Sequence, residues 1–169
     1  MSMKRITALL AVAVMSISML TACGNGEADN NSVQEGSDAT TKMPAPGEVA
    51  EQLLSGVTFE QELSQLTDEE ITFYITVEDG VDGVMYMSSG STAEEIAVFE
   101  APDKNVAAAM LSNAKDFLSD QRSSFEDYIP EEAKRIDDAV VEQKCNYVVI
   151  CVSGDSATAK SVIEQAFGE

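Results

Sequence analysis

One stretch of this chain carries a helical repeat long enough to dictate what packs around it. Between Lys104 and Glu126, a row of side chains at steps of three or four residues is apolar except at Gln121: Val106, Met110, Ala114, Phe117, Gln121 and Phe125. This spacing places them on one face of an α-helix, and such a face must be buried against another element. Pro130 bars further continuation, because proline cannot complete the helical hydrogen bonding. The sequence therefore predicts a long helix over 104–126.

Two pairs of short strands are predicted on either side of that helix. They are Val84–Met87 with Glu95–Ala101, and Ala139–Glu142 with Tyr147–Val152. The small residues from Ser88 to Thr92 suit a hairpin loop, and 143–146 suits a tight turn. Tyr147–Val152 is apolar on both faces, which is typical of a central strand.

Three shorter helices and two connecting segments complete the pattern. A helix is expected over 48–56, a second starting at the capping box Thr67-Asp68-Glu69-Glu70, and a last one after Gly154-Asp155-Ser156 that carries its apolar stripe from Ala159 to Phe167. The β-branched and aromatic run over 71–77 speaks against the second helix. Residues 78–83 are expected to form a loop, and 131–138 to connect the long helix to the second strand pair.

These elements predict an α+β domain made from two β-β-α units. Each unit has two strands at hairpin distance followed by a helix. Combined, they would form a four-stranded antiparallel sheet with the helices covering one face, which is a two-layer architecture. The short N-terminal helices would pack at an edge or on the other face.

The first 22 residues have the layout of a signal peptide. Lys4 and Arg5 precede an apolar stretch of 15 residues, Ile6 to Leu20, whereas a membrane-spanning helix needs about 20. Leu20-Thr21-Ala22-Cys23 then resembles the bacterial lipobox. The alternative is an ordinary secretory signal with Cys23 near its cleavage site by chance.

What the lipobox resemblance implies is cleavage between Ala22 and Cys23 and lipidation of Cys23. Acyl chains such as palmitate would hold the protein on the extracytoplasmic face of the cell membrane. The expected organisation is then a signal peptide over 1–22, a disordered tether rich in small and polar residues over 23–47, and one α+β domain over 48–169.

The charge of the chain restricts its partners. Without Lys4 and Arg5, eight basic residues remain against 30 acidic ones, a formal charge of −22. Such a surface repels nucleic acid. From Met43 to Asp103 there are 14 acidic residues and no Lys or Arg. A solvated surface is the simpler interpretation, and a cationic partner or Ca²⁺ remains the alternative.

Few catalytic chemistries are compatible with this composition. The chain has no histidine, which excludes Ser-His and Cys-His pairs and His-bearing metal sites. The acidic Glu78–Gly83 loop departs from the EF-hand spacing, and no glycine-rich phosphate loop occurs. We therefore expect no catalytic residue, cofactor or metal ligand. Two carboxylates acting in a hydrolase stay as a rival hypothesis.

Two segments are candidates for a partner surface. One is the loop from Ser88 to Glu95, with Ser89, Gly90, Ser91 and Thr92, and the other is Gln121–Pro130 at the end of the long helix, with Arg122 and Tyr128. The more economical interpretation of the second is that Phe125 and Tyr128 attach the helix end to the sheet. Of the remaining cysteines, Cys151 reads as a core residue and Cys145 as exposed at a turn.

Three segments together resemble a known family. They are Gly90-Ser91-Thr92-Ala93-Glu94-Glu95-Ile96-Ala97-Val98-Phe99, Ser124-Phe125-Glu126-Asp127-Tyr128-Ile129-Pro130 and Asn146-Tyr147-Val148-Val149. The likeness covers about Val49 to Phe167 and points to domain of unknown function 4358, found in small lipoproteins of mostly Gram-positive bacteria. In that family, glycine often stands where this chain has Cys145.

The resemblance implies a lipid-anchored domain of a Gram-positive envelope and brings no activity, cofactor or catalytic residue with it. We expect a non-catalytic lipoprotein that binds or scaffolds an envelope protein or ligand. A carboxylate-dependent envelope hydrolase and a substrate-capture lipoprotein of a transporter are the alternatives.

Overall fold

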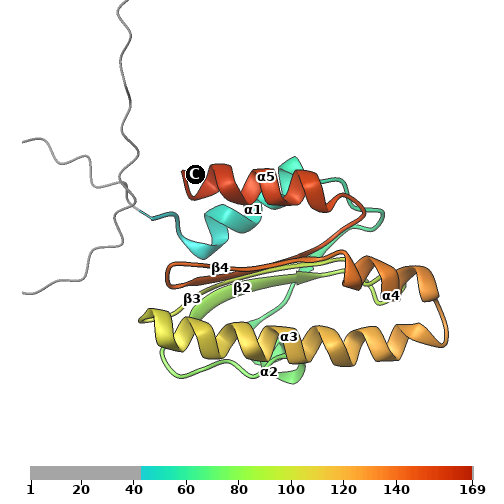
Figure 1. Ribbon diagram of the computed structural model, residues 1–169, viewed down its shortest axis with the longest axis horizontal. Helices are drawn as coiled ribbons and strands as arrows, with labels where there is room; N and C mark the ends of the chain where they lie inside the picture. The colour runs from blue at the N-terminus through green and yellow to red at the C-terminus, as the bar shows by residue number, and fades with distance from the viewer. Residues whose placement is uncertain (1–42, 169) are drawn as a thin grey trace, which may run out of the picture. The chain divides into compact units, whose positions relative to one another are not determined.

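The computed structural model describes residues 43–168 of the chain. Within them lie five helices and one five-stranded sheet (Figure 1). The helices are α1 (Pro46–Gly56), α2 (Asp68–Tyr74), α3 (Lys104–Glu126), α4 (Pro130–Asp137) and α5 (Ser156–Ala166). The strands are β1 (Ser64–Gln65), β2 (Asp82–Met87), β3 (Glu95–Glu100), β4 (Val140–Lys144) and β5 (Tyr147–Val152). No helix in this part of the chain is long and apolar enough to cross a membrane.

The sheet joins two hairpins through their second strands. Its order is β1-β2-β3-β5-β4, and all neighbouring strands are antiparallel. β3 and β5 pair along their whole length, from Glu95 opposite Val152 to Glu100 opposite Tyr147. These two strands therefore have a neighbour on each side, which agrees with the central position predicted for Tyr147–Val152.

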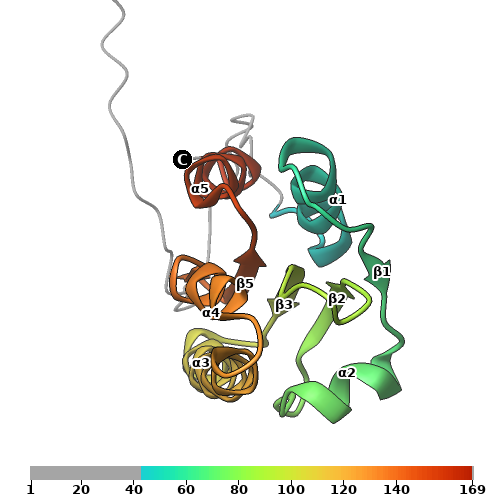
Figure 2. The same cartoon turned by 90° about the vertical axis from the view of Figure 1, so that its right-hand side faces the viewer.

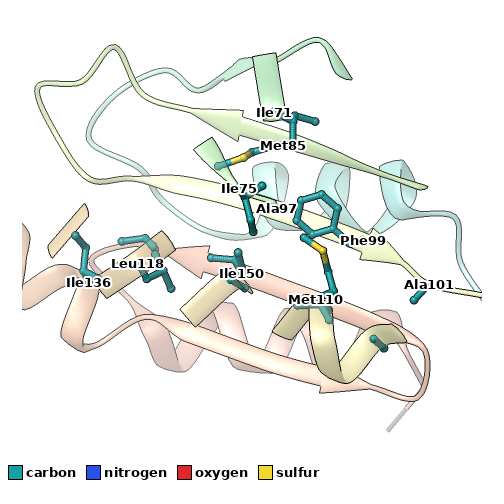
Figure 3. Close-up of a cluster of buried hydrophobic side chains, with 14 of the residues drawn as sticks. Ile71, Ile75, Met85, Ala97, Phe99, Ala101, Met110, Leu118, Ile136 and Ile150 are labelled. Atoms are coloured by element: carbon teal, nitrogen blue, oxygen red, sulfur yellow. The ribbon is translucent and has the colours of Figure 1, made fainter. Parts of the chain in front are cut away.

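Helices cover both faces of the sheet. In Figure 1, α1 and α5 lie on one side of the strands, and α2 and α3 lie on the other. Because successive side chains of a strand point to opposite faces, each central strand feeds two cores. Phe99 and Ile150 belong to the core beneath α2, α3 and α4 (Figure 3). Val98 and Val149 belong to the core beneath α1 and α5.

The α+β class is confirmed, whereas the two-layer sheet of four strands with helices on one face is wrong. α3 and α4 occupy one face of the second hairpin, so the other face of β5, with Val149 and Cys151, needs cover of its own. The apolar stripe of α5 supplies it through Ala159 and Ile163, together with α1. The fifth strand is β1, whose two residues pair with Met87 and Tyr86 of β2.

Local signals place most helix boundaries correctly. α3 spans the predicted 104–126, and Asp103 caps it by accepting from the amides of Asn105 and Val106. The Thr67 capping box is present, with Glu70 Oε2 accepting from the Thr67 amide at 2.8 Å. α2 then ends at Tyr74, before the β-branched run continues as extended chain.

Two predicted connections contain regular structure. Residues 130–137 form α4, in which Pro130 occupies the first turn, where a missing amide hydrogen costs nothing. β2 begins at Asp82, so the predicted 78–83 loop is shorter than expected. Gly83 therefore lies in the strand. Phe99 and the Val98 carbonyl leave no room for a larger residue at this position.

Candidate functional site

Four segments that are distant in sequence meet at one end of the sheet. We call it the loop end, defined by the hairpin loop 88–92, the chain at 60–61, the C-terminal end of α3 from Gln121, and α4. Figure 2 looks towards this end. The amide of Ala93 donates to Glu132 Oε2 at 2.7 Å, which attaches the base of the hairpin loop to α4.

Arg135 is the centre of the loop end. Its Nη1 donates to Glu94 Oε1 at 2.8 Å, and its Nη2 donates to Glu60 Oε1 at 2.7 Å and to Glu132 Oε1 at 3.1 Å. The Arg135 side chain is 11% exposed, and that of Glu94 is fully buried. We call these four residues the Arg135 network. It joins α4 to acidic residues of the segment Met43–Asp103, which has no Lys or Arg.

Glu94 fixes a second piece of chain at the same place. Its carboxylate accepts from the amides of Glu60 and Gln61 and from the Thr92 hydroxyl, in addition to Arg135. A buried charge is tolerable only when it is paired and hydrogen-bonded, and Glu94 meets both conditions. The network therefore uses its charges to hold segments together.

Glu95 is surrounded differently from its neighbour Glu94. It is fully buried and has one hydrogen bond, which Gln121 Nε2 of α3 donates to Oε2 at 3.0 Å. Burial raises the pKa of Glu95 to about 8, opposed only in part by this bond. The two adjacent carboxyl groups thus have different partners: Glu94 accepts from four groups of the protein, and Glu95 from Gln121 alone.

A shallow hollow of about 210 Å³ opens beside the network. Residues of α4 and of the β5–α5 connection line it, among them Lys134, Arg135, Ser153 and Gly154. The Lys134 ammonium in its rim is paired with Asp138 of the same helix. The hollow is lined by polar and charged residues of α4 and of the β5–α5 connection, and it includes Arg135 of the network.

All six predicted partner residues lie at the loop end, in two separate groups. Ser89, Gly90 and Ser91 are exposed at the tip of the hairpin, and Gly90 has a φ of +89°, which favours glycine. Thr92 is half-buried and bonded to Glu94. On the other side, the Arg122 side chain is held by Asp137 at 2.7 Å and Glu126 at 3.2 Å.

The predicted attachment of the helix end is correct for one aromatic residue and wrong for the other. Phe125 packs against the core beneath α3. Tyr128 is 86% exposed. The chain turns after Phe125, whose carbonyl oxygen accepts from the amides of both Tyr128 and Ile129. Tyr128 therefore projects from the turn between α3 and α4.

The cysteine predictions are confirmed. Cys151 lies in the core beneath α1 and α5, and burial raises the pKa of its thiol to about 12. Cys145 is exposed in the β4–β5 turn with a φ of +54°. This is the left-handed backbone conformation that favours glycine, in agreement with the glycine that the family resemblance implies there.

Other predicted features take no part in the loop end. In the acidic 78–83 segment, Glu78 accepts from Asn113 of α3 and Asp82 from the amide of Gly83. Among residues 43–168, no three acidic or cysteine side chains gather in a way that could hold a metal ion. The signal peptide, Cys23 and most of the predicted tether lie outside the described residues.

Sequence reasoning did not find Glu94, Glu95, Glu132 and Arg135. One signal was available in the pair Glu94-Glu95 directly before an apolar strand, where burial of at least one carboxylate was to be expected. Glu132 and Arg135, three residues apart, fall on one helix face once 130–137 is recognised as a helix. Their meeting with Glu60 is purely tertiary.

Comparison with known proteins gives one match. The family described as a domain of unknown function, DUF4358, matches residues 57–153, which include β1 to β5 and every residue of the Arg135 network. No curated protein and no solved structure matches the chain. The family match extends over more than half of the 169 residues, so this chain belongs to the DUF4358 family.

Proposed function

We propose that this protein is a lipoprotein anchored through Cys23 on the extracytoplasmic face of the membrane, and that its domain binds or scaffolds another envelope component. The support for anchoring is in the sequence, where a basic start, a 15-residue apolar stretch and Leu20-Thr21-Ala22-Cys23 follow one another at lipoprotein spacing. The binding component is an envelope protein or ligand that contacts the loop end.

The observation that carries the binding role is the hairpin loop on its buried ionic base. Ser89, Gly90 and Ser91 are exposed, while the adjoining Ala93 and Glu94 are bonded to α4 and to residues 60–61. A loop fixed in this way loses little conformational entropy when a partner binds it. Recognition loops on rigid scaffolds use the same principle.

The charged groups of the loop end are engaged in structure, which favours binding over catalysis. Both terminal nitrogens of Arg135 donate to carboxylates, and Glu94 accepts from four groups of the protein. A glycoside hydrolase that uses two carboxyl groups needs one to donate a proton and the second to act on the same bond. Glu94 and Glu95 have separate surroundings and do not form such a pair.

Lipid anchoring is tested by metabolic labelling with a palmitate analogue. The full-length chain is expected to take up the label and to fractionate with membranes, and Cys23→Ala is expected to lose the label and to accumulate as unprocessed precursor. A Cys23→Ala chain that is fully processed and still membrane-bound would show that another feature anchors the protein.

The binding role is tested by co-purification of the full-length protein from its own envelope. Ser91→Arg adds a bulky cation at the tip of the hairpin and is expected to reduce recovery of a specific partner by roughly tenfold, the effect of disturbing one energetically important contact. Asn105→Arg, at the opposite end of the sheet, is the matched control. Turnover of peptidoglycan, glycans or esters that one Asp or Glu change abolishes would instead support the hydrolase.

A further inference from the structure

Two buried oxygen atoms at the loop end have no hydrogen-bond donor. They are Glu95 Oε1 and Gln121 Oε1. The groups that carry them are already joined, since Gln121 Nε2 donates to Glu95 Oε2 at 3.0 Å. The two unsatisfied acceptors therefore belong to one contact between β3 and α3.

An ionised Glu95 leaves both oxygen atoms without a hydrogen-bond donor. A carboxylate can only accept hydrogen bonds, and so can the carbonyl oxygen of an amide. A buried acceptor without a donor destabilises the folded state, and it does so more strongly when it is charged. A single hydrogen atom placed between the two oxygens would satisfy both.

We propose that Glu95 is a neutral carboxylic acid at neutral pH and forms a cyclic pair with the Gln121 side chain. In this pair, Glu95 Oε1–H donates to Gln121 Oε1 while Gln121 Nε2–H donates to Glu95 Oε2. Release of the proton leaves a buried carboxylate facing an amide oxygen, and this loosens the contact of α3 with β3 at the loop end.

The groups packed around Glu95 give its ionised form little support. Its cross-strand neighbours, Met87 on β2 and Val152 on β5, are apolar. On α4, Glu132 is acidic, and the Arg135 guanidinium already serves Glu60, Glu94 and Glu132. The titratable groups next to it in sequence and on the adjoining strand are the acidic Glu94 and the thiol of Cys151, whose pKa is raised by burial and, to a smaller extent, by the charges of Glu95 and Glu94.

The position of the pair connects it to the proposed binding surface. Glu95 directly follows Glu94, which anchors the hairpin base, and Gln121 precedes Arg122 at the end of α3. The proton is thus held inside the structure that carries the hairpin loop. The inference concerns the domain itself and holds whether or not the loop end binds a partner.

The protonation state can be measured on the full-length wild-type chain without any variant. With ¹³C-labelled glutamate side chains, one carboxyl resonance is expected to report a protonated group at pH 6.5 and to titrate with a midpoint near pH 8. Glu95→Gln, an isosteric amide that preserves the cyclic pairing, should remove this resonance and so assign it. If every glutamate is ionised at pH 6.5, the proposal is wrong.

The linkage to folding provides the second test. In the unfolded chain Glu95 has its ordinary pKa of 4.5, and burial raises it to about 8 in the folded chain. Between these values the folded state binds one more proton. The stabilisation is therefore complete below pH 4.5 and is lost as the pH rises towards 8, at up to about tenfold in the unfolding constant per pH unit.

The comparison with Glu95→Gln isolates this term from the other carboxylates. The ratio of the wild-type to the Glu95→Gln unfolding constant is expected to rise between pH 5 and pH 8 and to level off above it. Ser112→Ala, an exposed change on α3 that removes no titratable group, should give a ratio that does not vary with pH. A pH-independent ratio for Glu95→Gln would overturn the proposal, and if that variant does not fold, the wild-type resonance decides the question.

Discussion

Gly83 occupies the point at which β2 passes closest to the side chain of Phe99. A Cβ atom at this position would lie 2.4 Å from Phe99 Cδ1 and 2.7 Å from the Val98 carbonyl oxygen. The second atom belongs to the backbone of the central strand and cannot move away cheaply. Gly83→Ala is therefore expected to lower the free energy of unfolding by about 1–3 kcal/mol, measured by urea denaturation.

A matched glycine tests whether crowding is the cause. Gly47 lies in the first turn of α1 with no atom within 4 Å of a built Cβ. Gly47→Ala should therefore leave stability unchanged or raise it slightly. Equal losses in both variants would indicate that chain flexibility, and not the contact with Phe99, decides the effect.

The two cysteines of the domain should differ sharply in reactivity. Cys151 is completely buried, and the raised pKa of its thiol keeps it protonated, whereas thiol reagents attack the thiolate. In the folded chain, a maleimide is expected to modify Cys145 and to leave Cys151 unmodified until denaturant is added. Mass spectrometry of the labelled peptides, with Cys145→Ser as the control, checks this. Rapid native labelling of Cys151 would contradict its burial.

At the scale of elements, Arg135 determines how α4 is attached to the rest of the fold. Removing it leaves the carboxylates of Glu94 and Glu132 buried without their cation. Breaking a buried ion pair in this way typically costs about 3–5 kcal/mol, so Arg135→Met should strongly destabilise the protein in urea denaturation.

Arg122 provides the contrasting case for that prediction. It also has two carboxylate partners, Asp137 and Glu126, but all three side chains are at least one-third exposed. Solvent screens exposed ion pairs, which therefore contribute little to stability, and Arg122→Ala should lower the stability far less than Arg135→Met. Similar losses for Arg135→Met and Arg122→Ala would mean that burial of the Arg135 network does not matter.

The elements most accurately predicted from sequence are those with a local cause. The 104–126 helix follows from its own apolar period and from Asp103 and Pro130 at its ends, and the helix after Thr67 follows from its capping box. α4 was missed because Pro130 was interpreted only as a stop, although proline is equally suited to the first turn of a helix. β1 has two residues and exists only because β2 lies beside it.

The whole molecule differs most from the predicted fold in having helices on both faces of the sheet. Tyr147–Val152 is apolar at every position, which already requires cover on both sides of the sheet. The predicted fold places this strand centrally but puts the helices of both β-β-α units on one face. Once α3 and α4 occupy one face, α5 can bury its stripe only on the other.

The loop end also depends on the whole molecule. Glu60 and Arg135 are 75 positions apart in the chain, and neither has a local pattern that predicts the contact. The sequence did place the hairpin loop and the end of α3 among the candidate surfaces, because small polar residues mark the first, and an arginine followed by two aromatic residues marks the second. Their meeting at one end follows from strand order, which was not predicted.

We propose that this domain contacts an envelope partner through the loop end. Photo-crosslinking of the full-length protein in its own membrane tests this contact, with a photoreactive residue at position 91, at 128 or at the control position 105. If the loop end is the contact surface, positions 91 and 128 should each give a discrete crosslinked species, and position 105 should give none. Equal crosslinking from both ends of the sheet, or from position 105 alone, would contradict it.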